Sequence, residues 1–167
     1  MLIRTEAPAD ILVIDRLLKT TFETEAEANL VMALRENSKL TLSLVACNDE
    51  GEVVGHAMFT PVTLQGEDLN WQGLAPVSVR EDYRKQGIAA TMIREGIESL
   101  YEFGYPACVV LGDPNYYQRF GFEAAEKHHM QCLWDVPEGV FQVLAIADGE
   151  LAERRGLIEY SEEFSQL

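Results

Sequence analysis

The chain has 167 residues, of which 47% are hydrophobic and 25% are charged, as is typical of a soluble globular protein with a substantial core. Its 28 acidic and 13 basic side chains give a formal net charge of −15. This charge argues against nucleic-acid or anionic-membrane binding, because both require a positive surface. An acidic surface would suit a cationic substrate, although it more often serves solubility alone.

Targeting signals are not evident. No stretch approaches 18 apolar residues, and the start Met1–Glu6 lacks the basic segment and long apolar run of a signal peptide. The three cysteines, Cys47, Cys108 and Cys132, form no CxxC pair, which favours free, buried thiols in a reducing compartment. We therefore expect a single cytoplasmic domain over residues 1–167.

The N-terminal half predicts two helices and an antiparallel meander. Ile11, Ile14 and Leu18 form one helical stripe, and alternating leucines from Leu40 onward have strand period. The turn signal Asn48–Gly51 predicts a hairpin between two of the strands. The predicted elements are a strand at 1–4, helices at 9–19 and 25–37, and strands at 40–46, 53–64 and 69–79.

The C-terminal half begins with a strand–helix–strand succession. A helix at 88–103, ended by Gly104, leads to the valine-rich run 107–111, which is typical of a fully buried strand. Strands joined by a crossover helix are normally parallel, so we expect an α+β domain with a mixed sheet. Further predicted elements are a short helix at 115–120, strands at 131–134, 141–147 and 157–160, and a short helix at 147–155.

The segment 77–90 is the first candidate functional site. An apolar strand, Val77–Val79, passes through a charged loop into a helix, with Gly87 at the bend. A helix start offers unpaired backbone N–H groups, Gly87 lets a phosphate approach the main chain, and Arg84 and Lys85 add positive charge. These features predict a pyrophosphate site. The alternative is an ordinary strand-to-helix turn without a ligand. It is supported by the absence of the two common phosphate-binding motifs, GxGxxG and GxxxxGK[ST].

A second motif follows the buried strand. Tyr117 is separated by three residues from Gly121 and Phe122. Aromatic residues near a helix end are usually part of the core, so this motif alone carries little weight. The combination is more specific: apolar strand, Arg-x-x-Gly-x-Ala at residues 84–89, a helix of about four turns, another apolar strand, then Tyr-x-x-x-Gly-Phe.

This succession resembles the GNAT superfamily of acyl-CoA-dependent N-acetyltransferases, and residues 112–122 resemble its predicted bacterial YhbS-type branch. The resemblance implies a GNAT-like, mostly antiparallel central sheet with a splayed parallel strand pair and flanking helices. It also implies acetyl-CoA as co-substrate. Proteins that it resembles are commonly homodimers.

The resemblance assigns roles to particular residues. Main-chain groups of Val77, Ser78 and Val79 would contact the pantetheine arm, and a backbone N–H of that strand would polarise the thioester carbonyl. Tyr117 would protonate the departing thiolate, whereas Tyr116 is one residue out of register and would pack in the core or line the pocket. The pyrophosphate would be held by Arg84 and by backbone N–H groups of Lys85, Gln86, Gly87, Ile88, Ala89 and Ala90.

Some family features are missing. Ala89 stands where the family often has glycine, and Val110 and Leu111 occupy the region where many members carry a cofactor-contacting asparagine. No motif fixes a general base. The candidates are Asp113, Glu67, Asp68 and His56, but Asp113 is more often a turn residue capping a short helix, and His56 a satisfied core residue.

Other chemistries find less support. His128 and His129 would point to opposite sides of a strand, so we expect no metal site, and there is no GxSxG nucleophile elbow. The Arg154–Arg155 pair is interpreted as a solvated surface. We predict an N-acetyltransferase that acts by direct attack of an amine, on a small molecule or a protein, in a ternary complex. A non-catalytic acyl-CoA-binding or regulatory module is the alternative, and a longer acyl donor is a more distant one.

Overall fold

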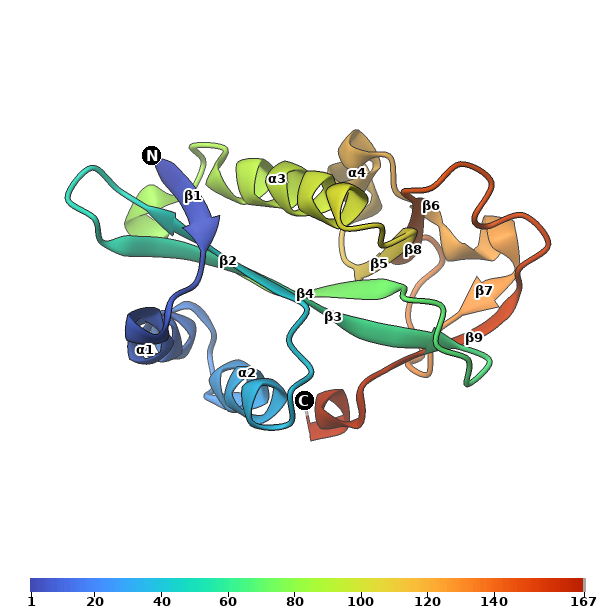
Figure 1. Cartoon of the computed structure of the whole chain (residues 1–167), viewed down its shortest axis with the longest axis horizontal. Helices are drawn as coiled ribbons and strands as arrows, with labels where there is room; N and C mark the ends of the chain where they lie inside the picture. The colour runs from blue at the N-terminus through green and yellow to red at the C-terminus, as the bar shows by residue number, and fades with distance from the viewer. Residues whose placement is uncertain (167) are drawn as a thin grey trace. The chain divides into compact units, whose positions relative to one another are not determined.

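The computed structural model describes residues 1–166 and shows an α+β fold (Figure 1). The helices are α1 (Ile11–Thr21), α2 (Ala26–Glu36), α3 (Ile88–Glu102) and α4 (Pro114–Tyr117), with 3-10 turns η1 (Pro8–Asp10), η2 (Glu81–Tyr83), η3 (Gln118–Phe120), η4 (Ala125–His128) and η5 (Glu162–Gln166). The strands are β1 (Leu2–Thr5), β2 (Leu42–Cys47), β3 (Val53–Leu64), β4 (Gln72–Val79), β5 (Ala107–Leu111), β6 (Glu123–Ala124), β7 (Met130–Gln131), β8 (Phe141–Ala145) and β9 (Gly156–Tyr160).

The chain forms two compact units, which are described separately. Unit 1 contains Met1–Phe59, Ala75–Gly96 and the described residues from Glu162 onward, and unit 2 contains Thr60–Leu74 and Ile97–Ser161. The strands β3 and β4 and the helix α3 each run from one unit into the other.

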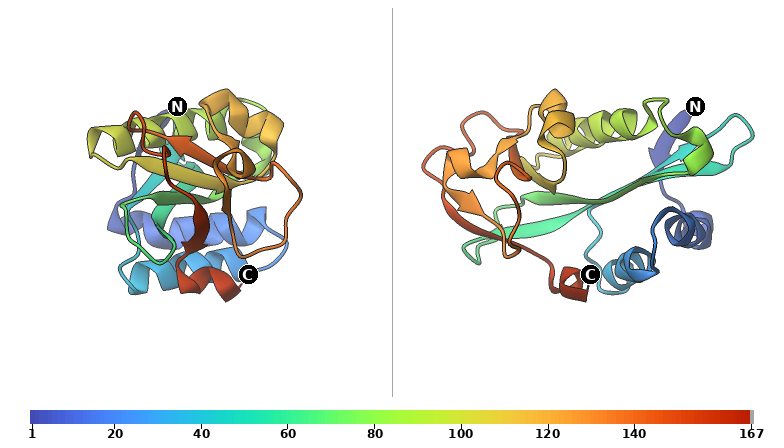
Figure 2. Two further views of the ribbon diagram at one scale, coloured as in Figure 1. Left: turned by 90° about the vertical axis from the view of Figure 1, so that its right-hand side faces the viewer. Right: turned by 180° about the vertical axis from the view of Figure 1, so that it is seen from behind.

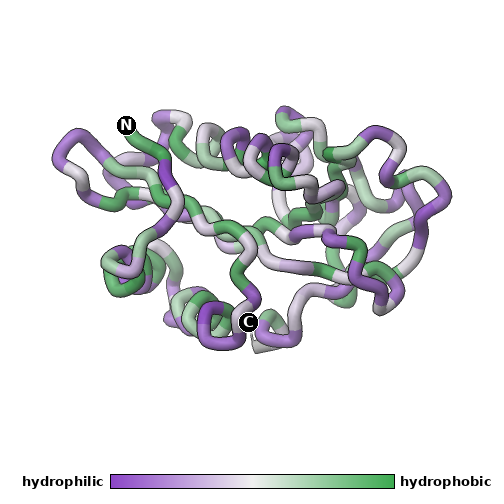
Figure 3. Tube along the Cα trace, in the orientation of Figure 1, coloured by the Kyte–Doolittle hydropathy of each residue, from purple (hydrophilic) through white to green (hydrophobic). Residues whose placement is uncertain are grey.

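Unit 1 is built on antiparallel strands. β1 pairs with β2, and β2 pairs with β3, with Leu44 opposite Ala57. The end of β4 lies beside β3, as shown by the hydrogen bond that the Arg80 N–H donates to the Val54 carbonyl at 2.8 Å. Within this unit, α1 and α2 lie on one face of the strands and the first part of α3 lies on the other (Figures 1 and 2). The turn at 48–51 is a hydrophilic stretch of the chain (Figure 3).

Unit 2 contains the parallel strand pair that the crossover helix predicts. β4 pairs with β5 at Gln72↔Cys108 and Gly73↔Val109, and β5 continues antiparallel to β8, which pairs with β6. The end of β3 pairs with β9, and β9 also pairs in parallel with β7. The turn between β3 and β4 has Gln65 and Gly66 both at positive φ, 52° and 77°, as in a type I′ hairpin.

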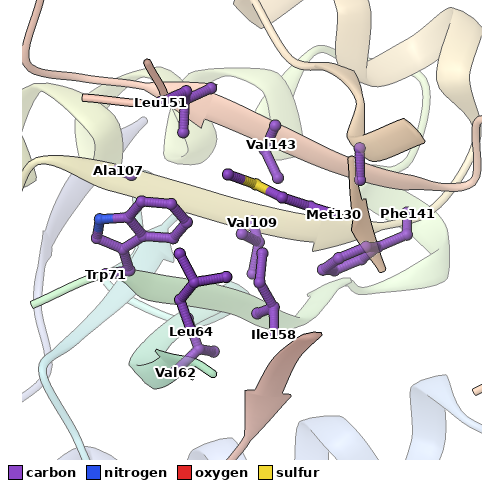
Figure 4. Packing of buried hydrophobic residues seen from close by; sticks show 11 residues of the cluster. Val62, Leu64, Trp71, Ala107, Val109, Met130, Phe141, Val143, Leu151 and Ile158 are labelled. Carbon is purple, nitrogen blue, oxygen red and sulfur yellow. The ribbon is translucent and has the colours of Figure 1, made fainter. Parts of the chain in front are cut away.

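The core of unit 2 is drawn in Figure 4. Trp71 is fully buried, and its indole N–H donates to a carboxylate oxygen of Glu150 at 2.9 Å, which satisfies its one polar atom. Val109 of β5, Val143 of β8 and Ile158 of β9 are also fully buried around it. This core fixes β5, whose carboxyl end leads to Tyr117.

The boundaries predicted for β3 and β5 are confirmed, and α1, α2 and α3 agree within two residues. The predicted helix at 147–155 is wrong: this segment forms turns, and Gly149 and Glu153 have φ of 77° and 62°, which a right-handed helix excludes. The predicted strand at 131–134 is reduced to Met130–Gln131, and β6 was not predicted. In the described residues, no helix has both the length and the apolarity needed to cross a membrane.

Candidate active site

The loop between β4 and α3 lies in unit 1 and has the conformation expected of an anion site. Lys85 and Gly87 both have positive φ, 64° and 78°. These left-handed residues turn the chain sharply before α3 begins at Ile88. The first N–H groups of a helix have no partner within the helix, so those of residues 88–90 are available to a ligand. The Gly87 carbonyl is used differently: it accepts both from the Thr91 N–H at 3.0 Å and from the Thr91 hydroxyl at 2.9 Å.

Space is open at this bend. A Cβ atom added to Gly87 would meet nothing within 4 Å. Gln86, Gly87 and Ile88 line a pocket of about 440 Å³, together with Thr91, Glu95 and the N-terminal residues Met1, Leu2 and Ile3. A bulky anionic group can therefore approach the main chain at Gly87 without displacing protein atoms.

The two cationic side chains of the loop are exposed. The Arg84 guanidinium is held at one point, where its Nε–H donates to the Val79 carbonyl at 3.1 Å. Among residues 1–166, neither Arg84 nor Lys85 forms an ion pair. Arg80 instead pairs with Asp82 at 2.8 Å and lies over the Tyr83 ring, 4.9 Å from its centroid. Arg80 thus secures the loop, and Arg84 and Lys85 remain free to meet an anionic ligand.

The strand segment before the loop alternates in burial. Val77 and Val79 are half-buried, whereas Ser78 is 3% exposed. The valine side chains therefore lie on the opposite face of β4 from Ser78. Ile88 and Ala90 are buried and Ala89 is half-buried, so the contribution of these residues to a ligand would come from the backbone.

Tyr117 lies in unit 2, at the end of the helix that follows β5. Its ring packs directly on the backbone of Gly112, where an added Cβ would come within 2.4 Å of the ring. Tyr116 and Phe122 contact the ring edge-on, with centroids 5.1 and 5.8 Å away. The contact between Tyr117 and Gly112 was not predicted from the sequence. A glycine between the end of a strand and an aromatic motif is the signal that could have suggested it.

The Tyr117 phenol stays protonated at physiological pH. Burial above all, with smaller contributions from Tyr116 and Cys108, raises the pKa of this phenol to about 12. A pKa of about 12 makes the phenol a weaker acid than a free tyrosine. Burial also raises the pKa of the Cys108 thiol in this unit. A thiolate released in similarly apolar surroundings would become more basic for the same reason.

The structure answers several of the predictions about a general base. The Asp113 carboxylate accepts from the Asn115 N–H at 2.9 Å and caps α4, which is the turn role that was weighed against catalysis. Asp68 accepts from the Asn70 N–H at 2.9 Å in an exposed turn. His56 is fully buried, and burial lowers its pKa to about 4. The two carboxylates are thus engaged in exposed turns, and His56 is shielded from solvent.

Metal and thiol chemistry have no visible site in the described residues. No group of three or more His, Cys, Asp or Glu side chains in this part of the chain could hold a metal ion. Cys47 and Cys108 are buried free thiols, and Cys132 is half-buried. His128 pairs with Glu123 at 3.1 Å.

The fold and these two motifs define a class of protein. The sequence pattern of the acetyltransferase (GNAT) domain matches residues 3–125. The chain belongs to the GNAT acetyltransferase family.

Individual relatives agree with this assignment. The chain is 53% identical over 167 residues to the uncharacterized N-acetyltransferase YhbS of Escherichia coli K12, covering 100% of both proteins. A crystal structure of the Escherichia coli YhbS protein in complex with CoA has a TM-score of 0.95, with 98% of this chain and 91% of that chain covered. A GNAT family acetyltransferase from Brucella melitensis, in complex with acetyl-CoA, is 36% identical, with a TM-score of 0.82 and coverage of 98% and 97%.

Proposed function

We propose that this protein transfers the acetyl group of acetyl-CoA to a primary amine by direct attack in a ternary complex. The observation that carries the proposal is the full-length similarity to a protein crystallised with CoA, at 53% identity and a TM-score of 0.95. The Brucella melitensis relative was crystallised with acetyl-CoA itself. The loop geometry in unit 1 supports the same ligand, because it presents backbone N–H groups, open space and two free cations in one place.

The cofactor is assigned to the segment 77–90. Main-chain groups of Val77, Ser78 and Val79 bind the pantetheine arm, and one of their N–H groups polarises the thioester carbonyl as negative charge develops on its oxygen. Lys85, Gln86, Gly87, Ile88, Ala89 and Ala90 hold the pyrophosphate through backbone N–H groups, with the Arg84 side chain beside them. The left-handed conformation of Lys85 and Gly87 supports this assignment.

Tyr117 is assigned the role of general acid. When the C–S bond breaks, its electron pair stays on sulfur, and a proton from the phenol completes the free thiol. A matched donor and acceptor have similar pKa values. Burial raises the pKa of the phenol to about 12. Burial also raises the pKa of the leaving thiol, because it disfavours the charged thiolate. The pKa values of the phenol and of the leaving thiol therefore remain similar inside the site.

The acceptor is a small-molecule or protein amine. The net charge of −15 favours a cationic acceptor over an anionic one, because long-range attraction raises the local concentration of an oppositely charged substrate. Polyamines, aminoglycosides, amino acids, lysine side chains and protein N-termini form the natural test panel.

A thiol-release assay with acetyl-CoA and this panel tests the proposal, and Tyr117→Phe is the diagnostic variant. Phenylalanine keeps the ring on Gly112 and removes only the hydroxyl. We expect kcat to fall by about 10²–10⁴-fold, the usual contribution of a general acid, while the dissociation constant for CoA stays unchanged.

Two outcomes would contradict the proposal. Equal kcat in Tyr117→Phe and wild type would remove Tyr117 from the chemistry. Tight CoA binding by the wild type, with no thiol release for any amine, would favour a non-catalytic acyl-CoA-binding module.

A further inference from the structure

A polar network in unit 1, buried at Ser43 and His56 and half-buried at its other members, has no part in the chemistry proposed above. The Arg35 guanidinium of α2 donates two hydrogen bonds to the Glu6 carboxylate, at 3.0 and 2.9 Å. The Ser43 hydroxyl of β2 donates to the same carboxylate. The Nε2 atom of His56, on β3, lies 3.0 Å from the Ser43 oxygen. The network thus joins the end of β1 to α2, β2 and β3.

The hydrogen-bonding capacity of these groups fixes the tautomer of His56. The pKa of Glu6 is lowered: the hydrogen bonds from Arg35 and Ser43 overcome the effect of burial, which opposes it. Glu6 is therefore an ionised carboxylate that only accepts. The single Ser43 proton goes to Glu6, so Nε2 of His56 must be the donor to the Ser43 oxygen. His56 then carries its proton on Nε2, and Nδ1 presents a lone pair.

A second polar atom without a partner in the described residues lies on the neighbouring strand β4. The hydrogen bond from the Arg80 N–H to the Val54 carbonyl sets the antiparallel register of β3 and β4. Moving two residues forward on β3 and two residues back on β4 from this bond places His56 opposite Ser78. Directly opposed residues share a face of the sheet. His56 is 0% exposed and Ser78 is 3% exposed. Among residues 1–166, Nδ1 of His56 and the Ser78 hydroxyl oxygen both lack a hydrogen-bond partner.

Two facing, buried, unpartnered polar atoms are the usual setting of an ordered water molecule. We propose that His56, through a water shared with Ser78, takes the proton that the acceptor amine loses during acetyl transfer. This inference rests on the proposed function, because Ser78 belongs to the strand segment assigned to the cofactor arm. His56 acts through water and Ser78 and is therefore a proton-relay and positioning residue.

In the proposed reaction, each bond that forms is matched by one that breaks. The amine lone pair forms the C–N bond, and the carbonyl π pair moves to oxygen. The nitrogen then gives a proton through the water to Nδ1 of His56. The oxygen pair re-forms the carbonyl as the C–S bond breaks, and sulfur takes the Tyr117 proton. After product release, His56 returns its proton through the same water to solvent, and Tyr117 is reprotonated.

Charged and titratable neighbours make this relay workable. Glu6 stabilises an imidazolium through Ser43, Arg35 opposes it, and burial opposes it most, so the pKa of His56 lies near 4. His56 is therefore neutral at pH 7 with its lone pair free. Attack on the carbonyl makes the amine nitrogen cationic and far more acidic than the free ammonium ion, so even a weakly basic imidazole can accept its proton.

His56→Gln is the most informative variant, since a glutamine amide can still donate to Ser43 but has no basic nitrogen. We expect kcat with acetyl-CoA and the best panel amine to fall at least tenfold at pH 7, within the usual range for proton transfer. KM for acetyl-CoA should change by less than about twofold, as for loss of a transition-state interaction. The deficit should shrink as the pH rises, because hydroxide replaces the missing base. A merely structural defect would not be repaired by high pH.

The matched control is His128→Gln, which removes a histidine paired with Glu123 on the surface. It should match the wild type at every pH. Ser78→Ala removes one partner of the shared water with almost no change in volume, and should lower kcat in the same direction as His56→Gln.

Nitrogen NMR of the imidazole ring tests the shared water without any acceptor. The wild type should show a protonated Nε2 and a hydrogen-bonded, unprotonated Nδ1, and Ser78→Ala should shift the Nδ1 signal. A protonated Nδ1, or no shift in Ser78→Ala, would overturn the inference. So would a His56→Gln enzyme as active as the wild type at every pH. A wild type that acetylates no amine would instead overturn the proposed function, so the two failures are distinguishable.

Discussion

Tyr117 and Gly112 show how one residue pair can fix the position of an aromatic ring. The tyrosine ring occupies the space that a Cβ of residue 112 would fill, and Tyr116 and Phe122 hold its edges. The phenol therefore has little freedom to move, which suits a group that must meet a leaving sulfur atom. The packing also explains the raised pKa, because it removes water from the hydroxyl.

Gly112→Ala should disturb Tyr117 without touching its hydroxyl. The new methyl group would lie 2.4 Å from the ring, so the ring must move. We expect a loss of about 1–3 kcal/mol in the free energy of unfolding, as for overpacked sites, together with a large fall in kcat. Urea unfolding and the thiol-release assay measure the two effects.

A double-mutant cycle isolates the contact. In a Tyr117→Ala background the ring is gone, and Gly112→Ala should then be nearly neutral for stability. If Gly112→Ala destabilises both backgrounds equally, the clash with the ring is not the cause.

At the scale of elements, the loop between β4 and α3 depends on Gly87. Its φ of 78° is unfavourable for any side chain, although space around the Cβ position is open. Gly87→Ala should therefore lose about 1 kcal/mol of stability from conformational strain. It should also weaken CoA binding by at least tenfold, because the backbone N–H groups would be misaligned and the added methyl group would meet the phosphate.

Gly51→Ala is the matched control for this prediction. Gly51 has a φ of 81°, and its Cβ position is equally open, but it lies in the turn between β2 and β3. Calorimetry should show the same loss of stability and no change in CoA affinity. Equal affinities in Gly51→Ala and Gly87→Ala would refute the role of the Gly87 bend.

The sequence predicted the elements best where burial is simplest. The strand 107–111 was located correctly because a continuous apolar run bounded by turn residues indicates a fully buried strand. The strand 53–64 was located correctly because turn residues precede and follow it, which predicts a hairpin partner for the strand before it. The C-terminal third was predicted poorly. There the chain uses very short strands such as Glu123–Ala124, and left-handed residues such as Glu153, neither of which leaves a periodic pattern.

Part of the candidate site could be predicted because it follows local sequence motifs. The Gly87 loop and Tyr117 follow local motifs, so their conformations could be anticipated from sequence. The packing of Tyr117 on Gly112 and the pairing that we infer for His56 and Ser78 depend on tertiary contacts and strand register, which no local motif encodes. The acceptor site lacks a motif altogether.

At the scale of the whole molecule, buried titratable groups predict how stability depends on pH. Burial lowers the pKa of His56 from 6.5 to about 4 in the folded state. Between these values the unfolded chain binds more protons, so stability present above pH 6.5 is lost as the pH falls toward 4. The loss from this residue alone is about 3 kcal/mol.

Other groups extend this pH profile. Glu6 and Asp10 have lowered pKa values through their arginine partners, which adds a further loss of stability below about pH 4. Cys108, Tyr117 and Tyr160 have raised pKa values, so these groups ionise first in the unfolded chain and stability falls above about pH 9. Thermal unfolding from pH 3 to 11 should show a plateau between about 6.5 and 9, and His56→Gln should flatten the slope between 4 and 6.5. An unchanged slope in that variant would refute the assignment to His56.

Central to the proposed function is that the backbone around Gly87 holds the diphosphate of coenzyme A. Titration calorimetry of the wild type with CoA tests it most directly, alongside Gly87→Ala and Tyr117→Phe. We expect saturable binding at one site per chain, at least tenfold weaker in Gly87→Ala and unchanged in Tyr117→Phe. Absence of measurable CoA binding by the folded wild type, or equal binding by Gly87→Ala, would contradict it.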